Sequence, residues 1–235
     1  MIKSWFSQGG DKSQPQAMSV NQAPASQATA HQAKPSDTAA MQAPASQAAA
    51  SRGLAAGQSA SNTIVVGGGC FWCTEAVFLA VRGVVAVTSG YSGGKQNDPD
   101  YESICTGTTG HAEVVSVQFD PSTINLKTLY QIFFATHDPT TLNRQGYDNG
   151  TQYRSVIFTL DEEQLRVAQT LFAELEAAKV FGAPIVTEIV PLAQFWRAES
   201  YHQNYFERNP FQGYCMGVVA PKVAKFRKQF SKYLK

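Results

Sequence analysis

The folded part of the chain opens with residues 63–81, which read TIVVGGGCFWCTEAVFLAV. The β-branched run Thr63–Val66 predicts a short buried strand, and the three glycines after it predict a tight turn. Apolar residues then recur at the spacing of a helix that covers residues 70–81 and is closed by Gly83, namely Phe71, Val77, Phe78 and Val81. A cysteine therefore stands where a strand, a glycine turn and a helix meet.

The sequence that follows alternates between strand and helix patterns. Strands are predicted at residues 84–91, 112–119, 155–160 and 185–190, and helices at residues 125–136 and 161–180. The pattern is clearest where Val115, Val117 and Phe119 alternate with polar residues. The order β-α-β-β-α-β-α-β predicts a single α+β domain over residues 62–235. We expect a two-layer sandwich, with helices packed on a mixed sheet as in a ferredoxin-like plait.

Residues 1–61 differ in composition from the rest of the chain. They are rich in Ala, Gln, Ser and Pro, and the phrase Gln-Ala-Pro-Ala-Ser-Gln-Ala occurs at residues 22–28 and again at 42–48. A segment with so few apolar residues cannot bury enough surface to offset the entropy lost on ordering. We interpret residues 1–61 as a disordered N-terminal extension or linker, with a partner-binding segment as the alternative.

Composition excludes several classes of protein. The formal net charge is +1, so no basic excess is present to bind a nucleic-acid backbone. No apolar run approaches the ~20 residues that cross a bilayer. Residues 1–11 lack the apolar stretch of ~7–15 residues that a secretory signal needs, so we expect a cytoplasmic protein. We further expect a monomer that interacts with neither nucleic acid nor membrane.

The four cysteines, at positions 70, 73, 105 and 215, allow four interpretations. A disulfide framework is unnecessary for a domain this size with so many aromatic residues. A four-thiolate zinc site would usually need a second C-x-x-C pair, which the sequence lacks. A nucleophilic Cys70 fits best, because amides and the positive end of the dipole at a helix start favour a thiolate and lower the thiol pKa. A buried structural cysteine is the remaining alternative.

Three motifs in order resemble the A-type peptide methionine sulfoxide reductases. They are Gly69-Cys70-Phe71-Trp72 with Glu75 after it, the segment Gly110–Val114, and the segment Asp148–Ser155. The resemblance extends over residues 63–230. It implies a thiol-dependent reductase of the S epimer of methionine sulfoxide, free or within proteins, that uses neither a metal nor a bound organic cofactor and takes thioredoxin as its reductant.

The resemblance assigns the two reacting groups. Cys70 would attack the sulfoxide sulfur, release methionine and become a sulfenic acid. Glu113 would protonate the departing oxygen, which requires that burial raise its pKa. From the strand pattern alone Glu113 could face solvent or the interior, and the motif favours the interior.

The resemblance also assigns residues that bind the substrate. Tyr101 and Tyr153 would donate hydrogen bonds to the sulfoxide oxygen, supported by Asp148. Phe71 and Trp72 would form an aromatic wall against the methyl group on sulfur, although either could equally be a core residue.

Two cysteines compete to resolve the sulfenic acid. Cys215 lies in a glycine-flanked segment that we expect to be mobile, and it matches the resolving position of family members with a C-terminal cysteine. Cys73 has C-x-x-C spacing to Cys70 and stands where many relatives have Gly. We favour Cys215 narrowly, and a relay through both is an alternative. Cys105 is expected to be a packed thiol.

Two further residues of the motifs receive no chemical role. Glu75 is interpreted as a carboxylate that complements the helix dipole. His202 matches a family position near the site, but the sequence assigns it no definite function. The alternatives from other classes are a zinc-stabilised peptide-binding module and a thioredoxin-like disulfide exchanger built on Cys70 and Cys73.

Overall fold

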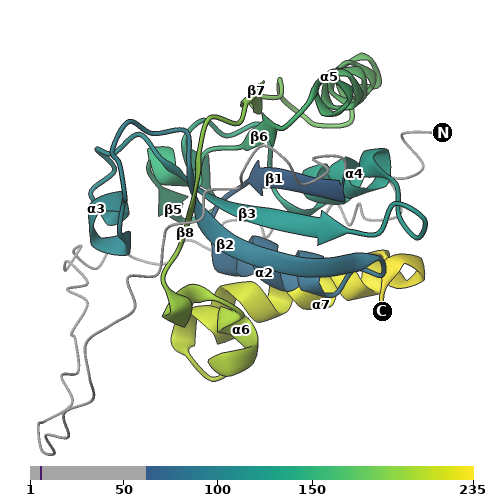
Figure 1. Cartoon of the computed structure of the whole chain (residues 1–235). Helices are drawn as coiled ribbons and strands as arrows, with labels where there is room; N and C mark the ends of the chain where they lie inside the picture. The colour runs from purple at the N-terminus through teal and green to yellow at the C-terminus, as the bar shows by residue number, and fades with distance from the viewer. Residues whose placement is uncertain (1–5, 7–61) are drawn as a thin grey trace, which may run out of the picture. The chain divides into compact units, whose positions relative to one another are not determined.

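A computed structural model describes Phe6 and residues 62–235 of the chain (Figure 1). The predicted extension, residues 1–61, lies outside the described residues except for Phe6, which is half-buried and meets Phe181 edge-on at 5.9 Å between ring centroids. Among the described residues, none of the helices is both long and apolar enough to span a bilayer.

The strands form one six-stranded mixed sheet and one small hairpin. The sheet has the order β7-β6-β1-β3-β2-β8, in which only the β6–β7 pair is parallel. The strands are β1 (Thr63–Gly67), β2 (Val84–Ser92), β3 (Ala112–Phe119), β6 (Val156–Thr159), β7 (Glu188–Pro191) and β8 (Phe195–Arg197), with the hairpin formed by β4 (Arg144–Gln145) and β5 (Asp148–Asn149).

The longer helices begin where the sequence supplies a cap. Asn125 accepts a hydrogen bond from the Thr128 amide at the start of one helix, and Asp161 accepts one from Gln164 at the start of another. The helices are α2 (Phe71–Leu79), α3 (Tyr101–Cys105), α4 (Leu126–Thr136), α5 (Glu162–Ala177), α6 (Tyr205–Arg208) and α7 (Ala220–Gln229), with 3₁₀ turns at Thr151–Tyr153, Ser200–His202 and Ser231–Tyr233 and a π-helical turn at Cys215–Val219.

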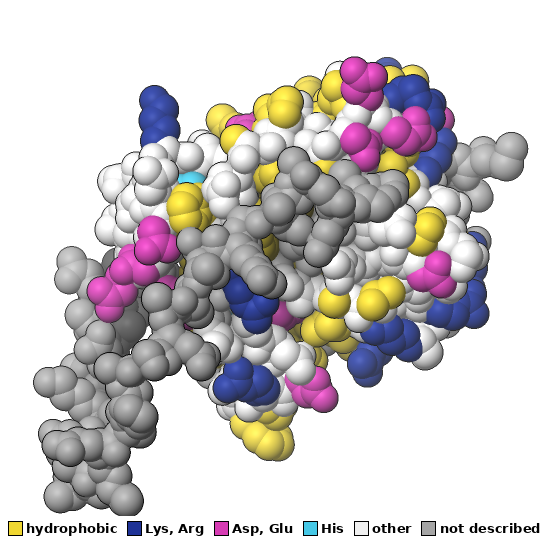
Figure 2. All heavy atoms as spheres, viewed as in Figure 1, with side chains coloured by type: hydrophobic (Ala, Val, Ile, Leu, Met, Phe, Trp, Pro, Cys, Tyr) yellow, Lys and Arg dark blue, Asp and Glu magenta, His cyan; other side chains and the backbone are white. Residues whose placement is uncertain are grey.

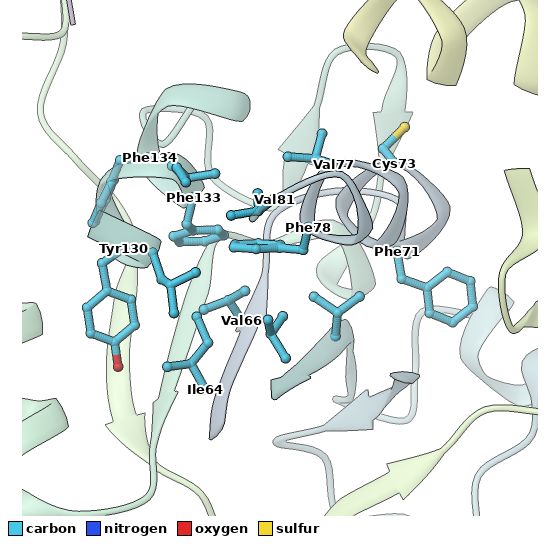
Figure 3. Close-up of a cluster of buried hydrophobic side chains, with 14 of the residues drawn as sticks. Ile64, Val66, Phe71, Cys73, Val77, Phe78, Val81, Tyr130, Phe133 and Phe134 are labelled. Carbon is cyan, nitrogen blue, oxygen red and sulfur yellow. The ribbon is translucent and has the colours of Figure 1, made fainter. Parts of the chain in front are cut away.

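The main core lies between the sheet and the helices. Alternate residues of β1 divide between the two faces: Ile64 and Val66 belong to the main core, whereas Val65 belongs to a smaller apolar cluster. Figure 3 shows Phe78 of α2 pointing toward Phe133 of α4. The helices α2, α4, α5 and α7 all contribute buried side chains to this same cluster, so the helix layer rests on one face of the sheet.

The eight predicted elements are all present in the predicted order, and the fold is α+β. The last predicted strand is displaced: Ile185 and Val186 are loop residues, because their amides donate to the Glu176 carboxylate and to the Pro139 carbonyl instead of to a neighbouring strand. The sequence patterns did not predict α3, the β4–β5 hairpin, β8 or α7. Helix α7 contains four cationic side chains, so its two buried apolar residues, Val223 and Phe226, did not stand out as a helical pattern in the sequence.

Gly90 is required where β2 meets β8. A Cβ atom at this position would lie 2.4 Å from both Phe195 Cζ and the Trp196 carbonyl oxygen. We expect Gly90→Ala to lower the free energy of unfolding by about 1–3 kcal/mol through overpacking. Urea unfolding measures this, and Gly182→Ala is the matched control, since nothing lies within 4 Å of its added Cβ. Equal stabilities for the two variants would contradict this assignment.

Candidate active site

A cavity of about 300 Å³ opens at the start of α2. Its walls contain all seven residues that the sequence analysis assigned to catalysis and substrate binding, together with Gln212 and Tyr214. The structure therefore brings together side chains from α2, α3, β3, β5 and the Thr151–Tyr153 turn. The two candidate resolving cysteines do not line this cavity.

Cys70 is the N-cap residue of α2 and is 8% exposed. The turn before it depends on Gly69, whose φ of 94° lies in the left-handed region and whose added Cβ would meet Gln145 at 2.6 Å. Immediately after Cys70, the amide of Phe71 donates a 2.9 Å hydrogen bond to Glu113 Oε2. The proposed nucleophile and acid are thus joined through one backbone group at the helix start.

The prediction that the helix start lowers the Cys70 pKa is wrong for this structure. Burial raises the pKa of Cys70 well above its ordinary value, and the Cys73 thiol and the Glu113 carboxylate reinforce that shift. The opposing hydrogen bond from the Trp72 amide is too weak to reverse it. Desolvation therefore outweighs the helix terminus, and Cys70 is held as a thiol.

The neighbouring Cys73 behaves in the opposite way. Its hydrogen bond with Cys70 lowers the pKa of Cys73 to about 7, against the effect of burial, and the charge of Lys222 acts in the same direction as the hydrogen bond. Of the two thiols in this C-x-x-C segment, Cys73 is consequently the more readily ionised.

Glu113 lies on β3 and is 2% exposed. It shares a strand face with Val115 and Val117, both of which belong to the main core, so its carboxyl group points toward the helix layer. Burial raises the pKa of Glu113 to about 8, although the Phe71 amide opposes the shift. The carboxyl group is therefore protonated at neutral pH, as the sequence analysis required of an acid.

Three tyrosines and one carboxylate form the polar side of the cavity. Tyr101 begins α3, and its amide donates to Glu199 Oε1 at 2.8 Å. Tyr153 ends the turn after β5. Burial raises the pKa of both phenols, which therefore remain neutral donors. Tyr214 donates a 2.7 Å hydrogen bond to Asp148 Oδ2. Tyr214 was missed, and its only sequence signal is its position next to Cys215.

The apolar wall is held by His202, to which the sequence assigned no role. The indole Nε1 of Trp72 donates to His202 Nδ1 at 3.1 Å, and Tyr205 stacks on a face of the indole with ring centroids 3.8 Å apart. Phe71 is 1% exposed, and its ring centroid lies 5.1 Å from that of His202. Burial lowers the pKa of His202 to about 4, so the ring is neutral and can accept the indole hydrogen bond.

Glu75 does not complement the dipole of α2 as predicted. Its side chain is 1% exposed and accepts hydrogen bonds from the amides of Asn204 at 2.8 Å and Tyr205 at 3.1 Å. Glu75 therefore fastens the start of α6 to α2, which places Tyr205 against Trp72. Its pKa is raised by burial.

The other cysteines differ from expectation in two respects. Cys215 begins a π-helical turn, is fully buried, and its amide donates to Gln212 Oε1 at 3.0 Å, so the glycine-flanked segment is helical here and not an open loop. Cys105 is exposed at the end of α3 instead of packed, because only Ile104 of that short helix is buried.

Within residues 62–235, no group of three or more His, Cys, Asp or Glu side chains is arranged to hold a metal ion.

Comparisons with known proteins agree with this geometry. Residues 62–234 match the family described as peptide methionine sulfoxide reductase. Peptide methionine sulfoxide reductase MsrA of Trichodesmium erythraeum is 57% identical over 169 residues, which cover 72% of this chain and 96% of that protein. MsrA of Polynucleobacter asymbioticus is 54% identical over 165 residues, which cover 70% of this chain and 87% of that protein.

A solved structure shows the same similarity in three dimensions. Methionine sulfoxide reductase A of Corynebacterium diphtheriae is 38% identical in sequence and superposes with a TM-score of 0.60, covering 68% of this chain and 80% of that one.

The raised pKa of Glu113 predicts a specific pH dependence of stability. Between pH ~4.5, where the unfolded carboxyl group titrates, and the folded pKa of about 8, the folded state binds the extra proton, so raising the pH destabilises it. The Glu113→Gln variant has no carboxyl group to bind this proton, so its stability lacks this dependence on pH. We expect the free energy of unfolding of Glu113→Gln, relative to wild type, to increase across this window and to level off above it.

Urea unfolding at a series of pH values measures this difference. Glu163→Gln is the control, since that carboxylate is exposed on α5 and has a lowered pKa. A constant difference between Glu113→Gln and wild type from pH 5 to 8 would show that Glu113 is ionised in the folded protein.

Proposed function

Because the chain belongs to the peptide methionine sulfoxide reductase family, it reduces the S epimer of methionine sulfoxide in peptides to methionine, and we propose that Cys70 attacks the sulfoxide sulfur. The observation that supports this role is the placement of a buried thiol and a protonated carboxyl group in one cavity, linked through the Phe71 amide. The activity repairs oxidised proteins.

The proposed step transfers oxygen from substrate to enzyme. Attack of the Cys70 sulfur on the substrate sulfur first forms an S–S bond. This bond and the substrate S–O bond then break as the Cys70 sulfur forms a bond to the oxygen. The substrate gains two electrons and leaves as methionine, while Cys70 loses two and becomes a sulfenic acid. Glu113 gives its proton to the oxygen and takes up the proton of the Cys70 thiol, so the carboxyl group ends as it began.

The remaining residues of the cavity bind the two ends of the sulfoxide group. Tyr101 and Tyr153 supply neutral O–H donors for the oxygen, where negative charge grows before protonation. Asp148 supports this side through its hydrogen bond with Tyr214. Phe71 and Trp72 receive the methyl group, and the indole is held in place by His202 and Tyr205.

We propose that the sulfenic acid is resolved by a relay from Cys73 to Cys215. The Cys73 thiol is hydrogen-bonded to Cys70 and ionises near pH 7, whereas Cys215 is fully buried with a raised pKa. Attack of Cys73 on the sulfenic sulfur forms the Cys70–Cys73 disulfide and releases the oxygen as water. Exchange with Cys215 then frees Cys70 again. These contacts reverse the narrow preference for Cys215 as the first resolving thiol.

The final disulfide needs two electrons from outside the chain. A dithiol protein of the thioredoxin class can supply them by thiol–disulfide exchange, and we propose that it does. That dependence favours a reducing compartment, so we propose a cytoplasmic location.

We also propose that β1, β2, β3 and β6 with α2 and α4 constitute a ferredoxin-like plait in two layers; the antiparallel order β6-β1-β3-β2 supports it.

The role of Cys70 is tested by a single turnover without reductant. Wild-type protein mixed with one equivalent of methionine S-sulfoxide should yield one equivalent of methionine, and Cys70→Ser should yield none, because a hydroxyl group cannot accept the oxygen. Amino-acid analysis measures the product. Cys105→Ser is the control, since that thiol is exposed outside the cavity; methionine formation by Cys70→Ser would refute the role of Cys70.

The relay predicts which disulfide each variant accumulates after that turnover. Cys215→Ser should stop at the Cys70–Cys73 disulfide, and wild type should proceed to a disulfide that contains Cys215. Peptide mapping by mass spectrometry identifies the pairs. Direct resolution by Cys215 would instead leave a sulfenic acid in Cys215→Ser and give a rapid Cys70–Cys215 disulfide in Cys73→Ser.

A further inference from the structure

Two aromatic side chains next to the cavity lining are exposed to solvent. Tyr147 is 100% exposed and Phe211 is 85% exposed, although each directly precedes a residue that lines the cavity, Asp148 and Gln212 respectively. Since consecutive Cα atoms are ~3.8 Å apart, the backbone of both residues lies next to the cavity lining. We call these two residues the aromatic rim. Their rings are available to contact a molecule that extends out of the cavity.

Both rim residues are fixed by their backbone. Tyr147 lies in the two-residue loop of the β4–β5 hairpin, after Gly146 with its positive φ of 62°, and its carbonyl accepts from Asn149 Nδ2 at 3.1 Å. Phe211 lies in a turn closed by the hydrogen bond from the Gln212 amide to the Asn209 carbonyl at 3.1 Å.

The two segments are also joined to each other. The 2.7 Å hydrogen bond between Tyr214 and Asp148 crosses from the Phe211 turn to the Tyr147 hairpin. The rim is therefore a preformed apolar feature on one side of the cavity. The α3 side differs, because acidic side chains gather there (Figure 2), including Asp100 and Glu102.

The size of the cavity determines what can meet the rim. A volume of about 300 Å³ accommodates one side chain, and the substrate is a methionine sulfoxide within a peptide. The backbone and the flanking residues of that peptide must then lie outside the cavity, where Tyr147 and Phe211 are exposed next to lining residues. We propose that the aromatic rim binds apolar residues that flank the methionine sulfoxide, and so selects extended peptide segments that are normally buried in folded proteins.

This inference rests on the proposed placement of the sulfoxide in the cavity, and it is tested with three substrates under dithiothreitol. These are N-acetyl methionine S-sulfoxide amide and two blocked pentapeptides in which methionine S-sulfoxide has Phe or Ser on both sides. Wild type should show kcat/KM about 10-fold higher for the Phe peptide than for the Ser peptide, a ratio typical of one or two aromatic contacts.

Variants of the two rim residues test whether the rim causes the preference for the Phe peptide over the Ser peptide. Tyr147→Ala combined with Phe211→Ala should reduce the ratio to less than about 2-fold and leave the rate on the blocked amino acid unchanged. Tyr147→Phe should retain the preference, because it keeps the ring. Val85→Ala is the matched control: Val85 is 70% exposed but lies six residues along β2 from Tyr91, the partner of Glu113, which is roughly 20 Å.

The outcomes separate this proposal from the proposed function. Absence of turnover on all three substrates would refute the function. If wild type turns over the substrates without preferring the Phe peptide, or if the double variant keeps that preference, the role of the rim in substrate selection is refuted and the proposed function stands. A double variant that is normal with dithiothreitol but slow when thioredoxin replaces it would identify the rim as a surface for the reductant and would overturn its role in substrate selection.

Discussion

The site depends on the hydrogen bond from the Phe71 amide to Glu113 Oε2. It joins the first turn of α2 to the middle of the sheet, and it holds the Glu113 carboxyl group beside Cys70 through the amide of the next residue. The donor is a main-chain group, so its position is set by the packing of β1, the glycine turn and α2, and only the Glu113 side chain has rotamers to fix. The same bond supplies the one favourable contact that a buried carboxyl group needs.

Desolvation decides the protonation state of five ionisable groups around this bond. Burial raises the pKa of Cys70, Glu113 and the two phenols, and it lowers that of His202, so each is held neutral. Cys73 is the exception, since its hydrogen bond with Cys70 outweighs its own burial. Cys70, which lines the cavity, is thus held protonated, whereas Cys73, which does not line it, is readily ionised.

Much of the fold follows from sequence patterns, and the seven residues that the family resemblance assigned to catalysis and substrate binding all line the cavity. The strand pattern left open whether Glu113 faces solvent or the interior, and the structure places its carboxyl group on the buried face that Val115 and Val117 share. The pKa of Cys70 could not be predicted, because a helix start lowers it while burial raises it, and only the three-dimensional packing shows which effect is larger. The contacts of Trp72 with His202 and Tyr205 join residues about 130 positions apart, for which no local pattern exists.

Neutral reacting groups suit a neutral, dipolar substrate. A sulfoxide enters without a compensating charge, so an ionised Cys70 or Glu113 would have to be desolvated with no partner. When both are protonated, charge appears only as the oxygen begins to leave, and at that moment the carboxyl group can deliver a proton and the thiol can surrender one. The raised pKa of Cys70 is then consistent with the proposed step, in which the carboxyl proton and the thiol proton both move and no thiolate has to exist beforehand.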